Sequence, residues 1–249
     1  MSVDFDYGLQ YQEFHQDNDA YFESRVVLEA DRLRPLVPPI PIKAALDIGC
    51  GMGFAMVAMQ RLGFEHVEGI DVDKSQIESA CRRGLKAFRI SSITDFLDAS
   101  DLQFDVVTMM DVLEHVPKDQ QVPTLRSIYR VIAPGGRLVI QVPNANSVAA
   151  SRWLYNDFTH ICSYTEQSLR PVLANGGFKT IKISAAGSTA HRPSLRPSQI
   201  FSKGTRDQAR RWLVRRLWRQ VLIAELGEGA RSFPLELNLV AIADKPLDA

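Results

Sequence analysis

The sequence has few cysteines and no excess of charge of either sign, and both absences narrow what the protein can be. Three cysteines occur in 249 residues, at Cys50, Cys81 and Cys162. An odd and sparse set of this kind predicts a reducing compartment, with no disulfide framework and no zinc site. Lys and Arg together number 29, and so do Asp and Glu. Because dedicated nucleic-acid binders carry a basic excess, this balance argues against that class.

Long hydrophobic segments are also lacking. No uncharged apolar run reaches the roughly 18 residues that a membrane-spanning helix needs. The first ten residues, MSVDFDYGLQ, are acidic and contain neither the basic nor the apolar region of a signal peptide. The sequence therefore predicts a cytoplasmic protein without a transmembrane segment, and it leaves the oligomeric state open.

What is present is the composition of a globular protein, with 45% hydrophobic and 23% charged residues. Segments typical of strands and of helices alternate along the chain. The predicted strands are 44–48, 67–71, 86–90, 104–109, 137–142, 178–183 and 236–243. The predicted helices are 11–36, 54–62, 74–83, 120–132, 166–175 and 206–226. This order predicts an α/β fold whose doubly wound, mostly parallel seven-stranded sheet binds ligands at the carboxyl ends of its strands.

We expect residues 1–249 to form one domain. Its expected parts are an N-terminal cap helix region at 1–40, a core at 41–186, a helical insertion at 187–234, and a last strand with a tail at 235–249. The interval between the last two predicted strands is too long for a simple connection, which is why an insertion is expected there.

The predicted helix within the insertion is rich in arginine and has apolar residues at helical spacing. Three interpretations fit this pattern. One is an amphipathic cover whose basic face lies in solvent. Another is a surface for an anionic acceptor. The third is peripheral contact with an anionic membrane, which Trp212 and Trp218 favour.

The most informative segment is 47–54, which reads Asp-Ile-Gly-Cys-Gly-Met-Gly-Phe and follows a predicted strand. Its glycines remove each Cβ that would obstruct a ligand, and the helix that follows points its free N–H groups at the same place. A dinucleotide fingerprint would have Gly or Ala where Phe54 stands. The carboxylate of Asp47 would oppose a pyrophosphate, whereas it suits a cationic ligand. A dehydrogenase is therefore the weaker interpretation.

Together with later segments, this run resembles the class I S-adenosylmethionine-dependent methyltransferases. Their first motif is a hydrophobic-Asp-x-Gly-x-Gly-x-Gly run, as in residues 45–53. The resemblance continues through 69–71, 104–107, 112–116 and 132–136, the last of which matches an L-x-P-G-G turn. It implies a Rossmann-like methyltransferase with S-adenosylmethionine as methyl donor and S-adenosylhomocysteine as product.

The resemblance also implies which residues hold the donor. Asp71 ends the second strand, where the family binds both ribose hydroxyls. Ser92 departs from the usual adenine-contacting Asp, and Tyr11 lies where many relatives have a helix that covers the cofactor. The expected cofactor-binding residues are Asp47, Gly49, Cys50, Gly51, Gly53, Phe54, Asp71, Val72, Ser92, Ile93, Met109 and Tyr11.

Candidates for acceptor chemistry follow the fifth predicted strand. Residues 143–169 resemble a "PN … D-x-T-H" segment found in methyltransferases of surface-polysaccharide pathways, which favours a sugar hydroxyl of a glycan or nucleotide-sugar as acceptor. An alcohol must lose a proton during attack, and His160 titrates in the right range to take it. Asp157 is its expected carboxylate partner. The alternative is that His160 only bonds a backbone carbonyl and shapes the pocket.

A second constellation is Asp111-x-x-Glu114-His115, which resembles a divalent-cation site in ubiquinone-type O-methyltransferases. It supports the alternative of a quinone or phenol acceptor with metal assistance. We expect no metal, since L-E-H-V runs also occur in methyltransferases that need none, and His115 is then a candidate beside the donor or the acceptor. A non-catalytic S-adenosylmethionine-binding protein is the alternative of another class, and the intact Asp47 and Asp71 argue against it.

Overall fold

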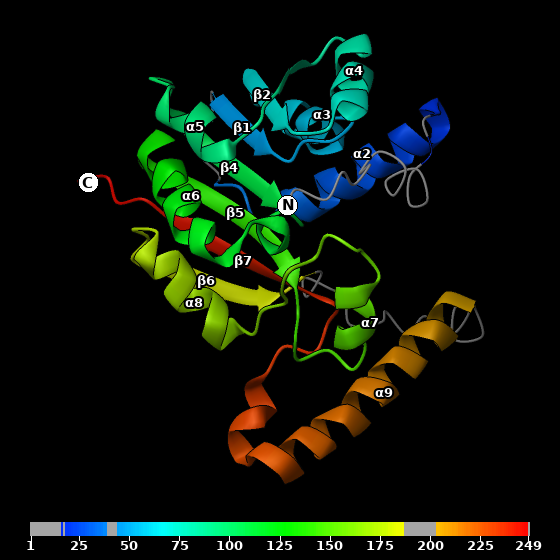
Figure 1. Cartoon of the computed structure of the whole chain (residues 1–249). Helices are drawn as coiled ribbons and strands as arrows, with labels where there is room; N and C mark the ends of the chain where they lie inside the picture. The colour runs from blue at the N-terminus through cyan, green and yellow to red at the C-terminus, as the bar shows by residue number, and fades with distance from the viewer. Residues whose placement is uncertain (1–15, 17, 39–43, 187–202, 249) are drawn as a thin grey trace.

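The computed structural model describes residues 16, 18–38, 44–186 and 203–248 of the chain. These residues form a seven-stranded sheet in the order β3-β2-β1-β4-β5-β7-β6 (Figure 1). All strand pairs are parallel except those of β7, which runs antiparallel to both of its neighbours. The strands are β1 Ala44–Ile48, β2 His66–Asp71, β3 Lys86–Arg89, β4 Phe104–Met110, β5 Ile132–Pro143, β6 Thr180–Ala185 and β7 Asn238–Asp244. The predicted mostly parallel seven-stranded α/β fold is confirmed.

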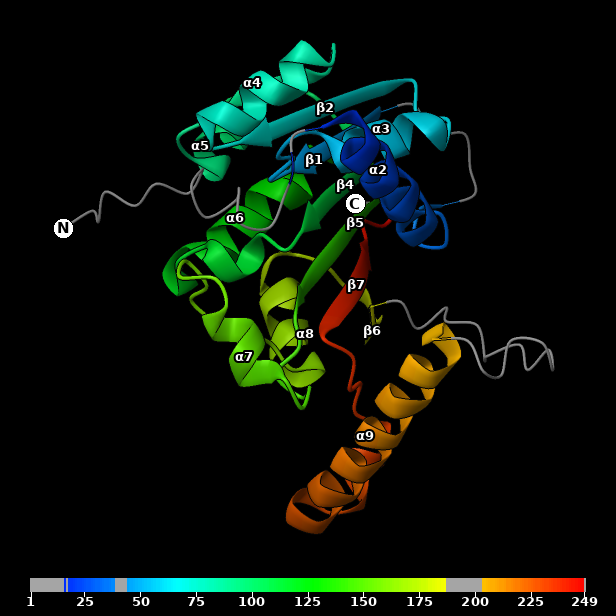
Figure 2. The ribbon, with the colours of Figure 1, turned by 90° about the vertical axis from the view of Figure 1, so that its right-hand side faces the viewer.

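Helices cover both faces of the sheet, each over its own apolar core. Buried residues of α2, α3 and α4 pack on one face, and those of α5, α6 and α8 pack on the other (Figures 1 and 2). The helices are α2 Asp19–Leu33, α3 Phe54–Arg61, α4 Lys74–Arg82, α5 Ile93–Asp98, α6 Lys118–Val131, α7 Ala150–Tyr155, α8 Glu166–Asn175 and α9 Lys203–Leu226. Short 3₁₀ turns are η1 Leu113–His115 and η3 Glu228–Ser232.

Capping residues fix several helix starts. The side chain of Asn18 accepts from the N–H of Tyr21 and caps α2, which occupies Asp19–Leu33 of the expected helix 11–36. Residues 1–15, which include Tyr11, lie outside the described part. Thr165 and Ser168 form a reciprocal capping box at the start of α8.

Other boundaries differ from the predictions. β5 begins at Ile132 and contains the Pro-Gly-Gly segment, which lies at a register shift between the pairs that Ile132 and Arg137 form with β4. The short helices α5 and α7 were not predicted. They contain only 6 residues each, too few to show a helical period.

Between β6 and β7 lies α9, which projects from the sheet and its covering helices (Figures 1 and 2). After η3 the chain returns, and β7 enters the sheet between β5 and β6. Within the part of the chain that the structure describes, no helix is long and apolar enough to cross a membrane.

Candidate cofactor and acceptor site

A cavity of about 750 Å³ opens where the strands β1, β2, β4 and β5 end. Its walls come from the first glycine motif, α2, the segment after β4, and the segment around α7. This is the edge of the sheet at which open α/β folds bind their ligands. The cavity therefore brings together most of the residues that the sequence singled out.

The glycine motif turns the chain tightly beneath this cavity. Gly49, Gly51 and Gly53 all have positive φ angles, between 53° and 93°. A Cβ on Gly49 would lie 2.2 Å from the Val112 side chain, and one on Gly53 would lie 2.1 Å from Leu85. Gly49 and Gly51 line the cavity. Gly53 instead is the residue before α3 and packs beneath the wall, so its expected direct contact with the cofactor is not supported.

Two carboxylates face the cavity from neighbouring strands. Asp71 accepts the N–H groups of Gly51 and Asp73, both at 2.9 Å, and burial raises its pKa. Asp47 is 3% exposed and accepts the hydroxyl of Thr108 at 2.6 Å. Burial raises the pKa of Asp47 to about 7 despite that hydrogen bond. A cationic ligand beside Asp47 would favour its ionised form.

The remaining predicted cofactor residues divide into two groups. Those that line the cavity as expected are Cys50, Phe54, Val72 and Ile93. The side chain of Met109 does not line the cavity, because it is fully buried in the core; the next residue, Met110, lines the cavity instead. Ser92 is also misplaced. Its hydroxyl accepts the N–H of Asp95 and caps α5, so Ile90 and Ile93 form that wall.

A polar network that the sequence did not predict joins α2 to the cavity floor. The guanidinium of Arg32 donates to Gln141 and lies 2.8 Å from Glu29. Gln141 in turn donates to Asp111 at 2.6 Å, and Asn238 donates to the other carboxylate oxygen at 3.3 Å. These contacts hold Asp111 at a φ of +56°, a strained conformation that persists where the surroundings fix it.

Two histidines lie side by side in the wall, with ring centroids 4.7 Å apart. Nδ1 of His115 is 2.8 Å from the hydroxyl of Thr159, and that hydroxyl donates to Asp157 at 2.6 Å. Burial lowers the pKa of His115 to about 4, so its ring is neutral at pH 7. We expected Asp157 to orient His160. In the structure Asp157 accepts the hydroxyl of Thr159, and this hydroxyl contacts His115 instead.

His160 has other partners. Its Nδ1 lies 3.3 Å from the carbonyl oxygen of Trp153, and its Nε2 lies 3.9 Å from Glu114. The side chain of Glu114 is fully buried, and neither of its carboxylate oxygens has a hydrogen-bond partner among the described residues. Burial raises the pKa of Glu114 well above its usual range, and the nearby Asp111 raises it further.

Glu114, His115 and His160 each offer one ligand atom, and these atoms lie within 4.8 Å of one another. The geometry therefore admits a divalent cation at this corner of the cavity. Asp111, which the sequence motif grouped with Glu114 and His115, is held in the Gln141 network instead. His160, from a distant segment, takes its place in the cluster.

Comparison with known proteins decides what kind of cavity this is. A family profile described as "Methyltransferase domain" matches residues 24–183. The chain belongs to this methyltransferase family. The expected identification as a class I S-adenosylmethionine-dependent methyltransferase, with S-adenosylmethionine as methyl donor, is confirmed.

Similar proteins agree with the family. A ubiquinone biosynthesis O-methyltransferase of Hahella chejuensis is 37% identical over 112 residues, or 43% of this chain and 46% of that protein. One from Vibrio cholerae is 30% identical over 164 residues, covering 64% of this chain and 58% of its own length. The chain thus spans about half the length of these curated relatives. A solved S-adenosylmethionine-dependent methyltransferase from Archaeoglobus fulgidus has the same fold, with a TM-score of 0.64, 22% identity, and coverage of 96% of this chain and 100% of that one.

The residues present fit this donor. Gly49 and Gly51 present no Cβ to the cavity. Asp71 accepts one N–H on each carboxylate oxygen, from Asp73 and Gly51, and a carboxylate has lone pairs for further donors such as the ribose hydroxyls. Asp47 lines the same cavity and would face the ammonium group of the donor. Phe54, also in the lining, packs against Tyr21 and Phe22 of α2. Burial raises the pKa of the Cys50 thiol far above its usual range, so this neighbour of the donor stays uncharged.

Proposed function

We propose that the protein methylates the hydroxyl oxygen of a phenol- or quinol-type small molecule. The observation that carries the proposal is the paired imidazoles of His115 and His160, which line the cavity beside the buried Glu114. The similarity to ubiquinone biosynthesis O-methyltransferases supports the same acceptor class over the sugar hydroxyl expected from the sequence. A phenolic hydroxyl, with a pKa of about 10, gives up its proton to an imidazole more readily than an alcohol does.

S-adenosylmethionine, when bound, would supply an electrophilic methyl group that passes to the acceptor oxygen in one in-line step, with S-adenosylhomocysteine as the leaving group. The protein then has to align the acceptor and remove its proton. The proton of the acceptor hydroxyl passes to Nε2 of His160, the ring nitrogen that lies toward Glu114. Glu114 lies 3.9 Å from this nitrogen, and because its pKa is raised its protonated form is favoured; positive charge that forms on His160 lowers that pKa and so couples the two groups. His115, held by Thr159 and neutral, fixes the position of the adjoining ring.

A labelled methyl donor tests the acceptor class. We expect transfer to catechols and hydroquinones but not to nucleotide-sugars. Transfer confined to nucleotide-sugars would overturn the acceptor class and restore the glycan expectation. Transfer to neither, with the donor bound, would favour a binding protein that has lost catalysis.

His160→Asn tests the proposed base. We expect a loss of about 10² to 10⁴ in kcat with little change in donor affinity, because a base acts on the acceptor only. His66→Asn is the matched control, since His66 is exposed at the start of β2 and remote from the cavity. Equal turnover by the two variants would remove His160 from the mechanism.

A metal-assisted reaction is the second candidate, and the unpartnered carboxylate of Glu114 favours it. Glu114, His115 and His160 would hold a divalent cation, which would acidify a bound hydroxyl in place of a base. Prolonged dialysis against a chelator, followed by metal analysis, separates the two. Full activity in metal-free protein supports the base; activity that returns only with added Mg²⁺ or Zn²⁺ supports the cation.

A further inference from the structure

The helix α9 presents large apolar side chains to solvent. Five of them are between 46% and 60% exposed: Trp212, Leu213, Val214, Leu217 and Val221. Isolated exposed apolar residues are ordinary, but a group of them on one element marks an interaction site. They lie on a helix that extends beyond the sheet and its covering helices (Figure 2).

Among the described residues, the contacts that hold α9 to the rest of the protein come from one side of the helix. Arg215 pairs with Glu236 at 3.1 Å, and the indole N–H of Trp218 donates to the Asn146 carbonyl at 2.9 Å. One turn is about 3.6 residues, so these positions share a face, and Leu213 and Leu217 lie on the opposite one. The apolar residues are therefore exposed because the anchored side faces the domain.

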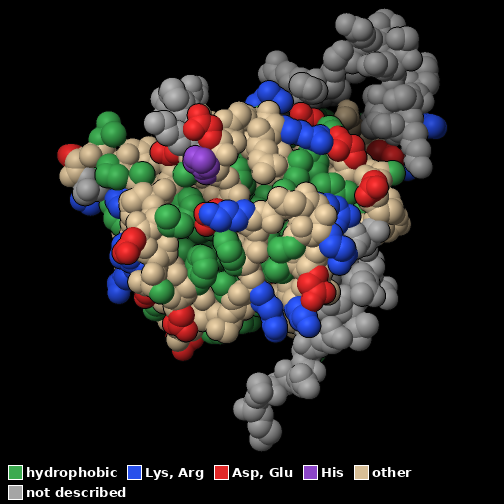
Figure 3. Space-filling view, turned by 90° about the horizontal axis from the view of Figure 1, so that it is seen from above, with side chains coloured by type: hydrophobic (Ala, Val, Ile, Leu, Met, Phe, Trp, Pro, Cys, Tyr) green, Lys and Arg blue, Asp and Glu red, His purple; other side chains and the backbone are tan. Residues whose placement is uncertain are grey.

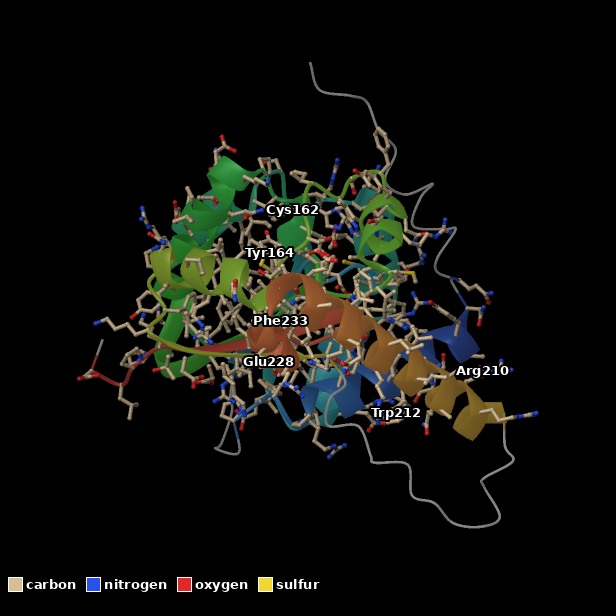
Figure 4. The ribbon with its side chains drawn as sticks, turned by 90° about the horizontal axis from the view of Figure 1, so that it is seen from below. Cys162, Tyr164, Arg210, Trp212, Glu228 and Phe233 are labelled. Carbon is tan, nitrogen blue, oxygen red and sulfur yellow. The ribbon has the colours of Figure 1, made fainter. Side chains whose placement is uncertain are left out.

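Basic side chains accompany the apolar ones. The exposed arginines of α9 are Arg206, Arg210, Arg211 and Arg216. The guanidinium of Arg216 lies over the ring of Trp212, 5.3 Å from its centroid. Arg210 and Trp212 lie on the half of α9 remote from Glu228 and Phe233 (Figure 4). On the face seen in Figure 3, by contrast, basic and acidic side chains are mixed.

We propose that α9 docks on the surface of an anionic lipid membrane. The helix lies in the plane of the interface, with Leu213, Leu217 and Val221 entering the region where headgroups meet acyl chains. The exposed face of α9 combines Arg206 and Arg210 with Leu213, Leu217 and Val221. Such a face suits a surface of anionic headgroups over acyl chains, because the headgroups attract the arginines and the chains accept the apolar side chains. The proposal goes beyond the methyl-transfer reaction and holds for any acceptor.

The exposed apolar face of α9 could also pair with the same face of a second copy of the chain. Pairing two α9 helices through Leu213, Leu217 and Val221 would bring Arg206 and Arg210 of both copies close to the same seam. Only Asp207 and Glu225 are acidic in this helix. Like charges brought together across an interface cost free energy, so the charge of α9 complements a lipid surface better than itself.

Co-sedimentation with vesicles tests the proposal on the full chain without any acceptor. We expect binding to vesicles of phosphatidylglycerol and phosphatidylcholine in equal amounts, weakening with salt, and little binding to pure phosphatidylcholine. The double variant Arg206→Gln, Arg210→Gln should bind roughly 30-fold more weakly, since both arginines share the helix face of Leu213 and Leu217 and each base near the surface supplies about 1 kcal/mol. Leu213→Gln with Leu217→Gln should also lose binding.

Matched controls remove basic and leucine side chains at exposed positions outside α9. Lys179→Gln with Lys182→Gln removes two exposed charges beside or on β6, and Leu102→Gln removes a 50% exposed leucine before β4. Both should bind like the natural protein. Absence of binding to the anionic vesicles, or equal binding by the α9 variants, overturns the proposal, as does light scattering that shows a dimer lost in the leucine variant. Methyl transfer to a soluble catechol without vesicles is measured in parallel, so that failure of this proposal is distinct from failure of the proposed reaction.

Discussion

At the scale of single residues, the burial of Asp47 lowers the stability of the ligand-free protein and favours binding of a cationic ligand. Asp47 is buried near two further acids, Glu29 and Asp71, which add to the effect of burial in raising its pKa to about 7. Its unfolded value is near 3.9. Because the folded pKa is the higher one, the free energy of unfolding falls as pH rises from about 4 to about 7. A cationic ligand would recover this cost on binding.

Asp47→Asn is therefore expected to stabilise the ligand-free protein at about pH 8, by up to about 4 kcal/mol, and to have little effect on stability at about pH 4. The amide oxygen can still accept from Thr108. The same variant should weaken S-adenosylmethionine binding, because it removes the charge opposite the ammonium group. Urea unfolding at the two pH values and calorimetric titration measure these effects.

An acid in solvent provides the control. Asp101→Asn changes the same group at an exposed position and should alter neither stability nor affinity. If Asp47→Asn destabilises the protein equally at about pH 8 and at about pH 4, then ionisation of the buried Asp47 does not lower the free energy of unfolding.

At the scale of elements, the first glycine turn and the segment after β4 depend on each other. Gly49 and Val112 are separated by more than sixty positions in the sequence, yet a Cβ on Gly49 would overlap the Val112 side chain. Val112 precedes η1, which carries Glu114 and His115. The close approach of this turn therefore sets the position of the acceptor side of the cavity.

Gly49→Ala should destabilise the protein by about 2–5 kcal/mol, from left-handed backbone strain plus the overlap with Val112. Gly63→Ala isolates the strain, because Gly63 has a φ of +99° and nothing within 4 Å of an added Cβ. It should cost only about 1–2 kcal/mol. Denaturant unfolding of both variants measures the difference, and equal losses would show that Val112 yields without cost.

Most strands and the longer helices could be predicted from the sequence, whereas the shortest helices could not. Hydrophobic period and capping residues are local, and they identified all seven strands. Six agree to within two residues at each end, whereas β5 begins five residues before its predicted start. The same patterns also gave α3, α4, α6 and α8 with similar accuracy. The glycine motif, Asp47 and Asp71 were recognisable because one continuous segment or strand end carries each of them. The short helices α5 and α7 have no period to detect.

At the scale of the whole molecule, the rest of the site depends on contacts between distant segments. Arg32 reaches the cavity from α2, Gln141 from β5 and Asn238 from β7. Nothing near Arg32 in the sequence distinguishes it from a surface arginine. Gln141 carried a weak signal, as a polar residue inside an otherwise apolar strand. The pairing of His160 with Glu114 in place of Asp157 likewise follows from how the α7 segment folds over the cavity.

The central claim is that this cavity holds S-adenosylmethionine, with Asp71 on its ribose. Calorimetric titration of the natural protein and of Asp71→Asn tests it most directly. We expect saturable binding of S-adenosylmethionine or S-adenosylhomocysteine at one site, no binding of NAD, and a loss of at least about tenfold in affinity in the variant, since two charge-assisted hydrogen bonds are weakened. Tight NAD binding with no heat from S-adenosylmethionine, or unchanged affinity in Asp71→Asn, would contradict the account.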